Sequence, residues 1–555
     1  MQADVCDFIV VGSGSAGGVL ANRLSENGRY KVVCLEAGTK GAKYIWTRPP
    51  LGIAFMIDNP EVNWRYSSEP SPSLGGRSIP VPRGKLLGGS SAMNGIVYNR
   101  GQRIDYDTWS AQGCAGWSHQ DVLPYFRKIE STAIGEDEYR GRTGPVKVIQ
   151  STKLCAFFDH FIAAAQAAGI PHNPDYSGAT QEGVAMAQLT CWRGERQSTA
   201  TAYIEPARGR ANLTVLQGAE ATSLILEGKR CIGVRYRRGG RVQEVRATRE
   251  VIVSAGAANT PKLLELSGVG DPDLLRKHGI RPLHELKGVG ENLRDHYAGI
   301  MKWRFNRPGI SAAPMGRGWR LVREVLRWGL FRTGLIAQGH GAMRVFAKSQ
   351  PQLAHPDLMM VVSPYIIDIK ESGRSRKISD VEGYMMYTHV QRTQSTGSIH
   401  LRSSDPSAPP VITYRFLETE YDRRVAVAAV RRARDIAAAS PMRELIAEEL
   451  APGAPVQSDE DILDFIRNTG QITQHMVGTC RMGHDAMAVV DERLRVHGLA
   501  GLRIADASIM PTIISGNTSV PCMMIGEKCA DMVLQDAERP AAASTPQRAP
   551  ELAAA

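Results

Sequence analysis

A glycine-rich turn near the amino terminus has the residue types and spacing that hold a pyrophosphate. Gly12, Gly14 and Gly17 form the pattern Gly-x-Gly-x-x-Gly, and Glu36 follows 24 positions after Gly12. Gly12 permits a tight turn, Gly14 lets backbone N–H groups approach a phosphate at a helix N-terminus, and Gly17 allows close helix–strand packing. The Glu36 carboxylate can accept hydrogen bonds from ribose hydroxyls. The spacing predicts dinucleotide binding without separating NAD from FAD.

The elements on either side of this turn occur in the order that such a site needs. Residues 6–11 form a β-branched and aromatic run typical of a strand, residues 19–24 have helical spacing, and residues 31–35 form a second apolar strand that ends at Glu36. Strand, turn, helix and strand together make a βαβ unit. The alternative interpretation is a structural βαβ turn that binds no nucleotide.

The composition is that of a globular protein with no metal or nucleic-acid signature. Of 555 residues, 43 % are hydrophobic and 22 % charged, enough to bury large cores. No apolar run reaches the roughly 18–20 residues of a membrane span and no signal peptide is recognisable, which favours a cytoplasmic location. Nine scattered cysteines without Cys-x-x-Cys spacing predict buried thiols and no metal site. A net charge of +11, spread along a chain with 6 % aromatic residues, argues against nucleic-acid binding.

Three further regions, taken with this turn, carry a family resemblance. They are residues 84–95 (GKLLGGSSAMNG), residues 256–270 (GAANTPKLLELSGVG), and a carboxyl-terminal pair at 475–479 (HMVGT) and 506–518. In this order they resemble the motifs of the glucose–methanol–choline (GMC) oxidoreductases. The resemblance implies an α/β fold, in which a doubly wound, Rossmann-like FAD-binding domain is interleaved with an α+β substrate-binding domain that carries an antiparallel sheet.

The resemblance also implies which residues contact FAD. These are Gly12, Gly14, Ser15, Gly17, Glu36, Gly88, Ser91, Asn94, Gly95, Val97, Ala221, Asp506, Ala507, Asn517 and Thr518. Many members of the family attach FAD covalently through a histidine in the second motif, whereas Met93 stands at the corresponding position here. Because a thioether cannot form that bond, we expect FAD to be bound noncovalently.

The family chemistry is the oxidation of alcohols, in which a base takes the hydroxyl proton while a hydride moves from carbon to the flavin. His475 matches the base position, and an imidazole with an unperturbed pKa near 6.5 suits that role. Asn517 matches the second position, where an amide can orient the substrate oxygen. We therefore expect oxidation of an alcohol, with a primary alcohol favoured, to an aldehyde or ketone, with electrons passed to a quinone-type acceptor. The alternatives are an oxygen-using oxidase, a non-redox hydroxynitrile lyase that holds FAD, and a non-catalytic flavin scaffold.

Two departures from the family pattern flank these positions. Met476 follows the base where close relatives often have proline, and Ser519-Val520 follows Thr518 where many have asparagine and a small residue. They leave the expected reaction type unchanged. The substrate of those relatives, however, cannot be assigned to this protein from the motifs alone.

The spacing of the motifs requires a discontinuous FAD domain. The predicted division is 1–160, 205–300 and 475–535 for the FAD-binding domain, 161–204 and 301–474 for the substrate-binding domain, and 536–555 for a disordered tail. Further predicted elements are a strand pair at 398–401 and 411–414, a helix at 423–438, and a meander of strands at 212–216, 221–226 and 233–236.

Residues 317–332 predict a basic amphipathic helix. Trp319, Val322, Leu326 and Leu330 fall on one face, and Arg320, Arg323 and Arg327 fall on another. The simpler interpretation is a surface helix packed on the substrate domain. The alternative is a helix that lies on an anionic membrane surface, at its inner face, close to a quinone pool.

Overall fold

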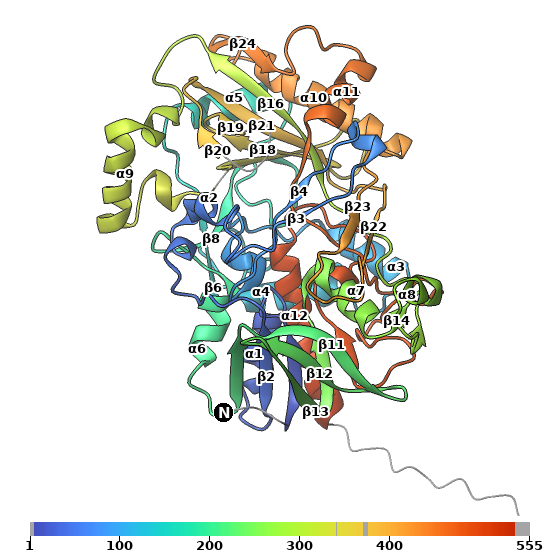
Figure 1. The fold of residues 1–555 in the computed structure, drawn as a ribbon. Helices are drawn as coiled ribbons and strands as arrows, with labels where there is room; N and C mark the ends of the chain where they lie inside the picture. The colour runs from blue at the N-terminus through green and yellow to red at the C-terminus, as the bar shows by residue number, and fades with distance from the viewer. Residues whose placement is uncertain (1–4, 340, 370–375, 539–555) are drawn as a thin grey trace, which may run out of the picture.

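Two large sheets organise the chain, one at each end of the molecule (Figure 1). The computed structural model describes residues 5–339, 341–369 and 376–538. The lower sheet in Figure 1 has the strand order β10–β2–β1–β13–β12–β11, with β26 also paired to β13. Its strands are β1 (Val5–Val11), β2 (Val32–Glu36), β10 (Leu213–Gln217), β11 (Glu220–Glu227), β12 (Arg230–Arg238), β13 (Arg241–Val253) and β26 (Leu502–Ile504).

The centre of this lower sheet is parallel. β1 pairs in parallel with β2 and β13, β2 with β10, and β13 with β26, whereas β11 and β12 form antiparallel pairs. The apolar, β-branched residues of β1 and β2 are mostly buried, as parallel strands covered on both faces require. The predicted dinucleotide-type βαβ unit, which includes β1 and β2, therefore lies inside the sheet and not at its edge.

The glycine turn fits helix α1 (Gly17–Ser25) tightly against β1. Gly12 has φ +97°, and a Cβ added at Gly17 would lie 1.9 Å from the Gly12 carbonyl oxygen. A side chain at either position would push the helix away from the sheet. Helix α12 (Ser519–Glu538) packs on α1 and on α4 (His119–Ile129) and completes this layer.

The upper sheet is antiparallel and runs in the order β24–β16–β21–β18–β17–β7, with β25 paired to β16. Its strands are β7 (Gly183–Met186), β16 (Tyr297–Phe305), β17 (Met343–Ala347), β18 (Leu358–Ser363), β21 (Gly383–Val390), β24 (Ile446–Ala451) and β25 (Gln471–Ile472). Helix α10 (Glu420–Ala438) packs on β21 and β18, with α5 (Phe157–Ala167) and α11 (Asp459–Thr469) beside it.

Smaller elements connect the two sheets. The remaining helices are α2 (Ile53–Met56), α3 (Arg103–Ala111), α6 (Glu205–Ala207), α7 (Gly256–Leu266), α8 (Pro272–Lys277) and α9 (Gly318–Phe331). The remaining strands are β3 (Tyr66–Ser67), β4 (Pro80–Val81), β5 (Glu130–Ser131), β6 (Val146–Gln150), β8 (Gln188–Trp192), β9 (Glu195–Arg196), β14 (Val269–Gly270), β15 (His284–Glu285), β19 (Ile367–Ile369), β20 (Arg376–Ile378), β22 (Ser398–His400) and β23 (Val411–Thr413).

The predicted α/β fold class with a second, antiparallel sheet is confirmed, and one local prediction is wrong. The strand at 212–216 is not part of a meander, because β10 pairs residue by residue with β2 in parallel, from Leu213 opposite Val32 to Gln217 opposite Glu36. The meander consists of β11, β12 and β13. An alternating apolar pattern identifies a strand and carries no information about its partner.

Other predicted elements occur close to their expected bounds. The strand pair β22–β23 and the helix α10 form as predicted. Eight cysteines are buried and Cys155 is half-buried, all as free thiols. Residues 536–538, predicted as part of a disordered tail, form the last turn of α12, and 539–555 lie outside the described residues. In the described part of the chain, no three or more His, Cys, Asp or Glu side chains are grouped so that they could hold a metal ion.

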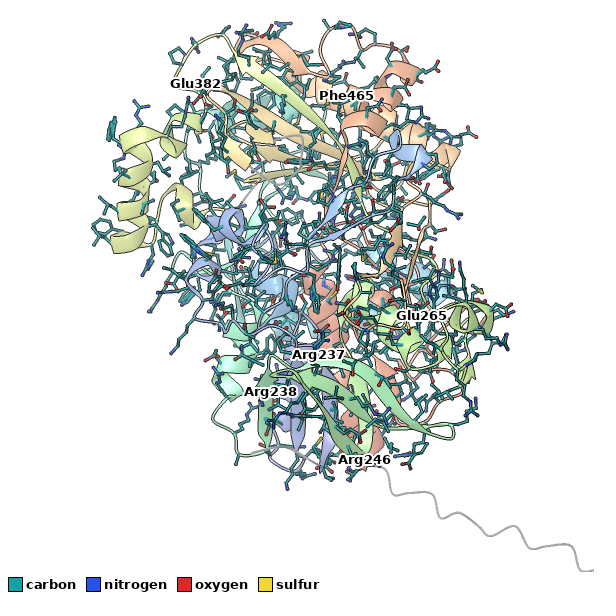
Figure 2. All side chains as sticks on the ribbon, in the orientation of Figure 1. Arg237, Arg238, Arg246, Glu265, Glu382 and Phe465 are labelled. Carbon is teal, nitrogen blue, oxygen red and sulfur yellow. The ribbon has the colours of Figure 1, made fainter. Side chains whose placement is uncertain are left out.

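Part of the positive charge on strands β12 and β13 is neutralised by ion pairs. Arg237, Arg238 and Arg246 lie on β12 and β13, at the lower end of the molecule in Figure 2. Arg237 contacts Glu220 at 3.0 Å and Arg246 contacts Glu227 at 3.3 Å. These ion pairs neutralise part of the positive charge of the two strands.

Helix α9 occurs where the sequence predicts it, but its apolar face does not pack on the protein. Trp319, Val322, Leu326 and Leu330 are 67 %, 59 %, 58 % and 74 % exposed. In Figure 1 this helix projects from the side of the molecule. The interpretation as a packed surface helix is therefore wrong for this face. None of the helices in the described ranges is long and apolar enough to span a bilayer.

Candidate active site

A cavity of about 410 Å³ is bounded by residues of both sheets. The lower sheet contributes Val11 and Leu35, and the upper sheet contributes Val361 and Tyr387. Most of the predicted site residues line this cavity: Gly12, Gly14, Ser15, Glu36, Asn94, Gly95, Val97, Ala221, Asp506, Ala507, Asn517 and Thr518, together with His475. Segments from four distant parts of the sequence thus meet at one place.

The lower part of the cavity fits a dinucleotide. A Cβ added at Gly14, Gly95 or Gly256 would meet nothing within 4 Å, so open space lies where a ligand's phosphates and ring would approach the backbone. The Glu36 carboxylate lies at the end of β2 and accepts hydrogen bonds from the Ser13 hydroxyl at 2.5 Å and the Gly38 N–H at 2.8 Å. These bonds hold it in one orientation on the cavity wall.

Three predicted residues, Gly17, Gly88 and Ser91, lie outside the cavity lining. Gly17 packs α1 on the turn, and the Gly88 N–H donates to the Ser13 hydroxyl at 3.0 Å. The Ser91 hydroxyl donates to the Gly88 carbonyl at 2.7 Å and contacts Thr199 at 3.0 Å. Their contacts shape the loops that carry the lining residues.

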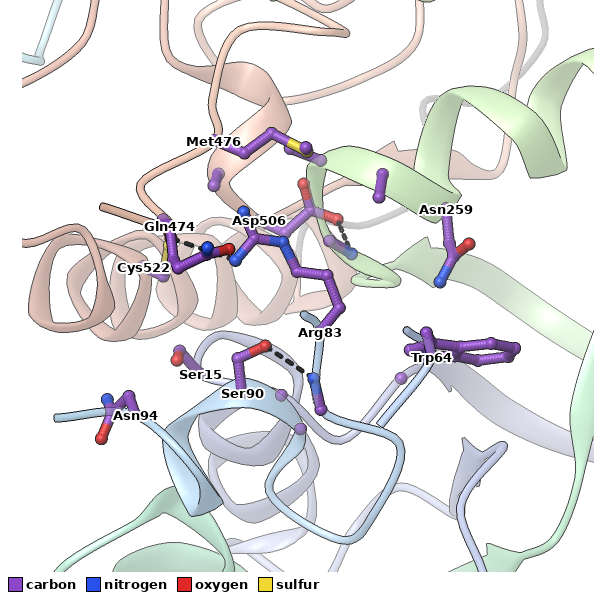
Figure 3. Close-up of a pocket in the computed structure, with 18 of the residues that line it drawn as sticks. Ser15, Trp64, Arg83, Ser90, Asn94, Asn259, Gln474, Met476, Asp506 and Cys522 are labelled. Atoms are coloured by element: carbon purple, nitrogen blue, oxygen red, sulfur yellow. Dashed lines mark hydrogen bonds between the residues drawn. The ribbon is translucent and has the colours of Figure 1, made fainter. Parts of the chain in front are cut away.

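His475 lies on the loop after β25, at the boundary between the two sheets. Its backbone N–H donates to Asp295 Oδ1 at 2.7 Å, which fixes the start of the motif. The preceding Gln474 has φ +70°, a left-handed conformation that non-glycine residues adopt mainly at constrained sites. Figure 3 shows Gln474 beside Arg83, whose Nη1 donates to the Gln474 carbonyl at 3.1 Å. The loop is therefore held from both sides.

The hydrogen bonds around His475 determine which ring nitrogen carries the proton. His296 Nε2 lies 2.6 Å from the Gln391 carbonyl, which can only accept, so Nε2 is the donor and Nδ1 of neutral His296 is the acceptor. His475 Nδ1 lies 2.9 Å from His296 Nδ1 and must therefore donate. Thr473 Oγ1, also 2.9 Å from His475 Nδ1, can share this proton. His475 Nε2 is left unprotonated, and Asn517 Nδ2 donates to it at 2.9 Å.

Burial keeps these histidines neutral. Burial, followed by the neighbouring His296 and His389, holds the pKa of His475 well below its usual 6.5. Burial lowers the pKa of His296 to about 4. The ring of His389 lies 5.3 Å from that of His296, and burial lowers its pKa too. An unprotonated Nε2 at neutral pH is the form of an imidazole that accepts a proton.

Asp295 is the buried carboxylate behind the histidines. Its Oδ1 also accepts the His296 backbone N–H at 2.8 Å, and its Oδ2 accepts the Tyr414 hydroxyl at 3.1 Å. Burial raises the pKa of Asp295 to about 6, against the opposing effect of Arg83, whose Nη2 lies 3.9 Å away. At neutral pH Asp295 is therefore a carboxylate that orders the backbone of both histidines.

Asn517 stands at the start of α12, opposite His475. Among the described residues its Oδ1 has no hydrogen-bond partner although it is buried. A buried amide oxygen without a partner is costly unless a ligand supplies a donor. The pair of His475 Nε2 and Asn517 thus presents one acceptor nitrogen and one adaptable amide to the cavity.

Sequence reasoning missed several residues of this site. His296, His389, Asp295, Arg83 and Arg344 lie on the cavity wall or directly behind it. His389 is a polar residue in the otherwise largely apolar strand β21, and Asp295-His296 precede the apolar strand β16. Polar residues in or beside buried strands were the available signal for them.

Comparison with known proteins agrees with this architecture. A family model described as GMC oxidoreductase matches residues 6–298 by its N-terminal part and residues 393–526 by its C-terminal part. An oxygen-dependent choline dehydrogenase of Brucella suis is 39 % identical over 530 residues, 95 % of each chain. One of Escherichia coli O127:H6 is 38 % identical over 533 residues, again 95 % of each.

Solved structures share the fold over almost the whole chain. Pyridoxine 4-oxidase from Mesorbium loti superposes with a TM-score of 0.86 at 27 % identity, covering 96 % of this chain and 99 % of that one. Formate oxidase superposes with a TM-score of 0.89 at 24 % identity, covering 97 % and 99 %, which is a likeness of fold alone.

The chain belongs to the GMC oxidoreductase family. It is an FAD-dependent oxidoreductase that acts on CH–OH donors, and the glycine-lined part of the cavity is the place where its residues fit the flavin nucleotide.

Proposed function

We propose that the protein oxidises a primary alcohol to an aldehyde, with His475 as the base. The observation that carries this proposal is the unprotonated Nε2 of His475, 2.9 Å from Asn517 Nδ2 on the cavity wall. Bound FAD supplies the two-electron hydride acceptor. His475 Nε2 accepts the hydroxyl proton, and the Asn517 amide orients the substrate oxygen. His296 accepts the Nδ1 proton of His475 and so holds the base in its reactive tautomer.

The electron acceptor is a quinone-type molecule in our proposal, with oxygen as the alternative that the names of the choline dehydrogenase relatives favour. The test is anaerobic mixing of the holoenzyme with primary alcohols while the flavin absorbance is followed. We expect bleaching, followed by faster reoxidation with a soluble quinone than with oxygen. A flavin that every alcohol leaves oxidised would point to a lyase or a scaffold and would overturn the proposal.

We propose that FAD contacts the predicted residues that line the cavity, and that the segments 1–160, 205–300 and 475–535 form the domain that binds it. The remaining segments, 161–204 and 301–474, form the substrate-binding domain. The supporting observation is that open space faces Gly14, Gly95 and Gly256.

The flavin is bound noncovalently in this proposal. Met93 lines the cavity at the position where a histidine would attach it, and a thioether forms no such bond. We expect acid precipitation of the purified enzyme to release all the yellow colour into the supernatant. Colour that stays in the pellet after washing would contradict this expectation.

We propose further that α9 rests on an anionic lipid surface. The exposed Trp319, Val322, Leu326 and Leu330 form a continuous apolar stripe, and Arg320, Arg323 and Arg327 lie along its edge. Apolar residues in the acyl boundary and arginines at the headgroups are the two components of an interfacial helix.

The other side of α9 is fixed to the protein. The buried Glu324 carboxylate accepts the Leu335 N–H at 2.8 Å, and Trp328 Nε1 donates to the Gly194 carbonyl at 2.8 Å. The apolar stripe is therefore turned outward by contacts on its far side. A second copy bound to this stripe about a two-fold axis would bring equivalent arginines together, so charge favours the lipid.

Sedimentation with vesicles tests this contact. The holoenzyme should bind vesicles of phosphatidylcholine with phosphatidylglycerol and bind pure phosphatidylcholine much less. We expect the double variant Leu326→Glu/Leu330→Glu to lower binding about tenfold or more. Val242→Glu is the matched control, because Val242 is an exposed apolar residue on β13, outside α9. This variant should bind normally.

Two outcomes would overturn the lipid contact. One is wild-type protein that stays in the supernatant with anionic vesicles at low salt. The other is a wild-type dimer in solution that the double variant converts to a monomer, which would assign the stripe to a second copy of the chain.

A further inference from the structure

Arg344 is a buried cation on the wall of the cavity. It lies on β17 and is only 2 % exposed. In the antiparallel register Arg344 is opposite Val361 on β18, and Val361 is opposite Tyr387 on β21. All three residues line the cavity that also contains His475. The sheet therefore presents a row of one cationic, one apolar and one aromatic side chain to the space beside the base.

The guanidinium of Arg344 has no carboxylate partner among the described residues. Its Nη1 donates to the carbonyls of Gly341 and Met343, each at 2.8 Å, and its buried Nε has no hydrogen-bond partner within the described ranges of the chain. The equally buried Arg140 and Arg503, by contrast, contact Glu130 at 2.9 Å and Glu250 at 2.7 Å. Burial lowers the pKa of Arg344 to about 10, so that it is still cationic at neutral pH.

A buried charge without a partner of opposite charge is destabilising. A ligand that binds the guanidinium would offset this cost. The edge of a guanidinium that contains Nε is one of the two that can bind a carboxylate through two parallel hydrogen bonds. Because the other side of Arg344 is held by backbone carbonyls, this edge is the one left for a ligand. The charge also helps to lower the pKa of His475, which places the two side chains in one electrostatic environment.

The carboxylates in the cavity lining have other partners. Glu36 accepts from Ser13 and Gly38, and Asp506 accepts from the Gly256 N–H at 2.9 Å and the Thr260 hydroxyl. Glu220 pairs with Arg237 at the edge of the lower sheet. A quaternary ammonium such as that of choline would therefore meet the positive charge of Arg344 without a free carboxylate from the described lining to balance it.

We propose that Arg344 binds a carboxylate of the substrate, so that the enzyme oxidises a primary alcohol that carries a carboxylate group. This inference rests on the proposed function. The substrate hydroxyl loses its proton to His475 and its carbon loses a hydride, two electrons, to bound FAD. The product is the corresponding aldehyde, with the carboxylate unchanged. Val361 and Tyr387 contact the carbon chain between the two polar ends.

The test compares substrates that differ only in charge. Anaerobic flavin reduction and steady-state turnover of the holoenzyme are measured with 4-hydroxybutanoate and 6-hydroxyhexanoate, with their methyl esters, and with choline. We expect kcat/KM for the better hydroxy acid to exceed that of its ester and that of choline about 10- to 100-fold, the usual worth of hydrogen bonds to a charged group. Equal or higher values for the esters or for choline would overturn the inference.

Substitution of Arg344 tests whether this side chain binds the carboxylate of the substrate. In Arg344→Leu the ratio of kcat/KM for hydroxy acid to that for ester should fall about tenfold or more, mainly through KM, with Arg344→Lys between the two. An unchanged ratio in a flavin-loaded variant would refute the role of Arg344. If Arg344→Leu does not fold, the wild-type comparison still decides. If no alcohol of any charge reduces the flavin, the proposed function itself has failed.

Discussion

Replacing His475 by glutamine is expected to lower kcat/KM for alcohol oxidation by about 10²- to 10⁴-fold, the usual contribution of a positioned general base. Glutamine keeps a polar side chain of similar length and removes the nitrogen that accepts the hydroxyl proton in the proposed mechanism. The measurement is the rate of anaerobic flavin reduction, corrected for flavin content. The loss should lie mainly in the reduction rate and not in reoxidation, because the missing group acts while the substrate is oxidised.

The pH profile of the wild-type enzyme provides an independent check on His475. Because burial holds its pKa below 6.5, the base is unprotonated at neutral pH, and kcat/KM should fall only as the pH drops through that lower value. The acid limb should be absent in His475→Gln. His484→Gln is the matched control, since that ring is more than half exposed and contacts Glu492 away from the cavity lining. A control variant with the same loss would place the effect elsewhere.

Replacing His296 by leucine should lower kcat about 10- to 100-fold, by analogy with the loss found when the hydrogen-bond partner behind a metal-binding histidine is removed. Leucine removes the acceptor for the Nδ1 proton of His475. The proton can then move to Nε2, where it blocks the position that must accept the substrate proton. We expect KM to change much less than kcat, because His296 acts through the tautomer of His475 and does not line the cavity.

His296→Gln distinguishes this positioning role from simple packing. A glutamine amide can donate to the Gln391 carbonyl and accept from His475 Nδ1, as the imidazole does. It should therefore recover a large part of the activity lost in His296→Leu. Equal losses in the two variants, at equal flavin content, would show that only the volume of the ring matters.

The sequence predicted those parts of the fold that are encoded locally. The Gly12 to Gly17 turn, the flanking strands and the helix follow from short-range geometry, and the structure contains them at nearly the predicted bounds. The partner of β10 could not be predicted, because β10 pairs with β2 across about 180 residues of sequence and a strand pattern does not specify its partner.

The residues of the candidate site fall into the same two groups, those that a local motif identifies and those that depend on contacts between distant segments. Most motif residues line one cavity, whereas His296, His389 and Arg344 lie in segments without a recognisable motif. Strand register and loop contacts bring them to the site: His296 contacts His475 across 179 positions, Arg344 lies opposite Ala185 of β7, and the His389 ring lies 5.3 Å from that of His296. The exposure of the apolar face of α9 could not be predicted either, because amphipathic spacing defines two faces and does not tell which of them packs on the protein.

The residues that line the cavity come from distant parts of the sequence, so we expect cofactor binding to require the folded whole chain. Gly12, Asn94, Ala221 and Asp506 line the cavity from four separated stretches of sequence, so a fragment that contains the whole cavity lining must include nearly the entire chain. A ligand that binds only the native state stabilises it by mass action, by about 2.7 kcal/mol when its free concentration exceeds Kd about a hundredfold. We therefore expect bound flavin to slow proteolysis of this enzyme, apart from its effect on turnover.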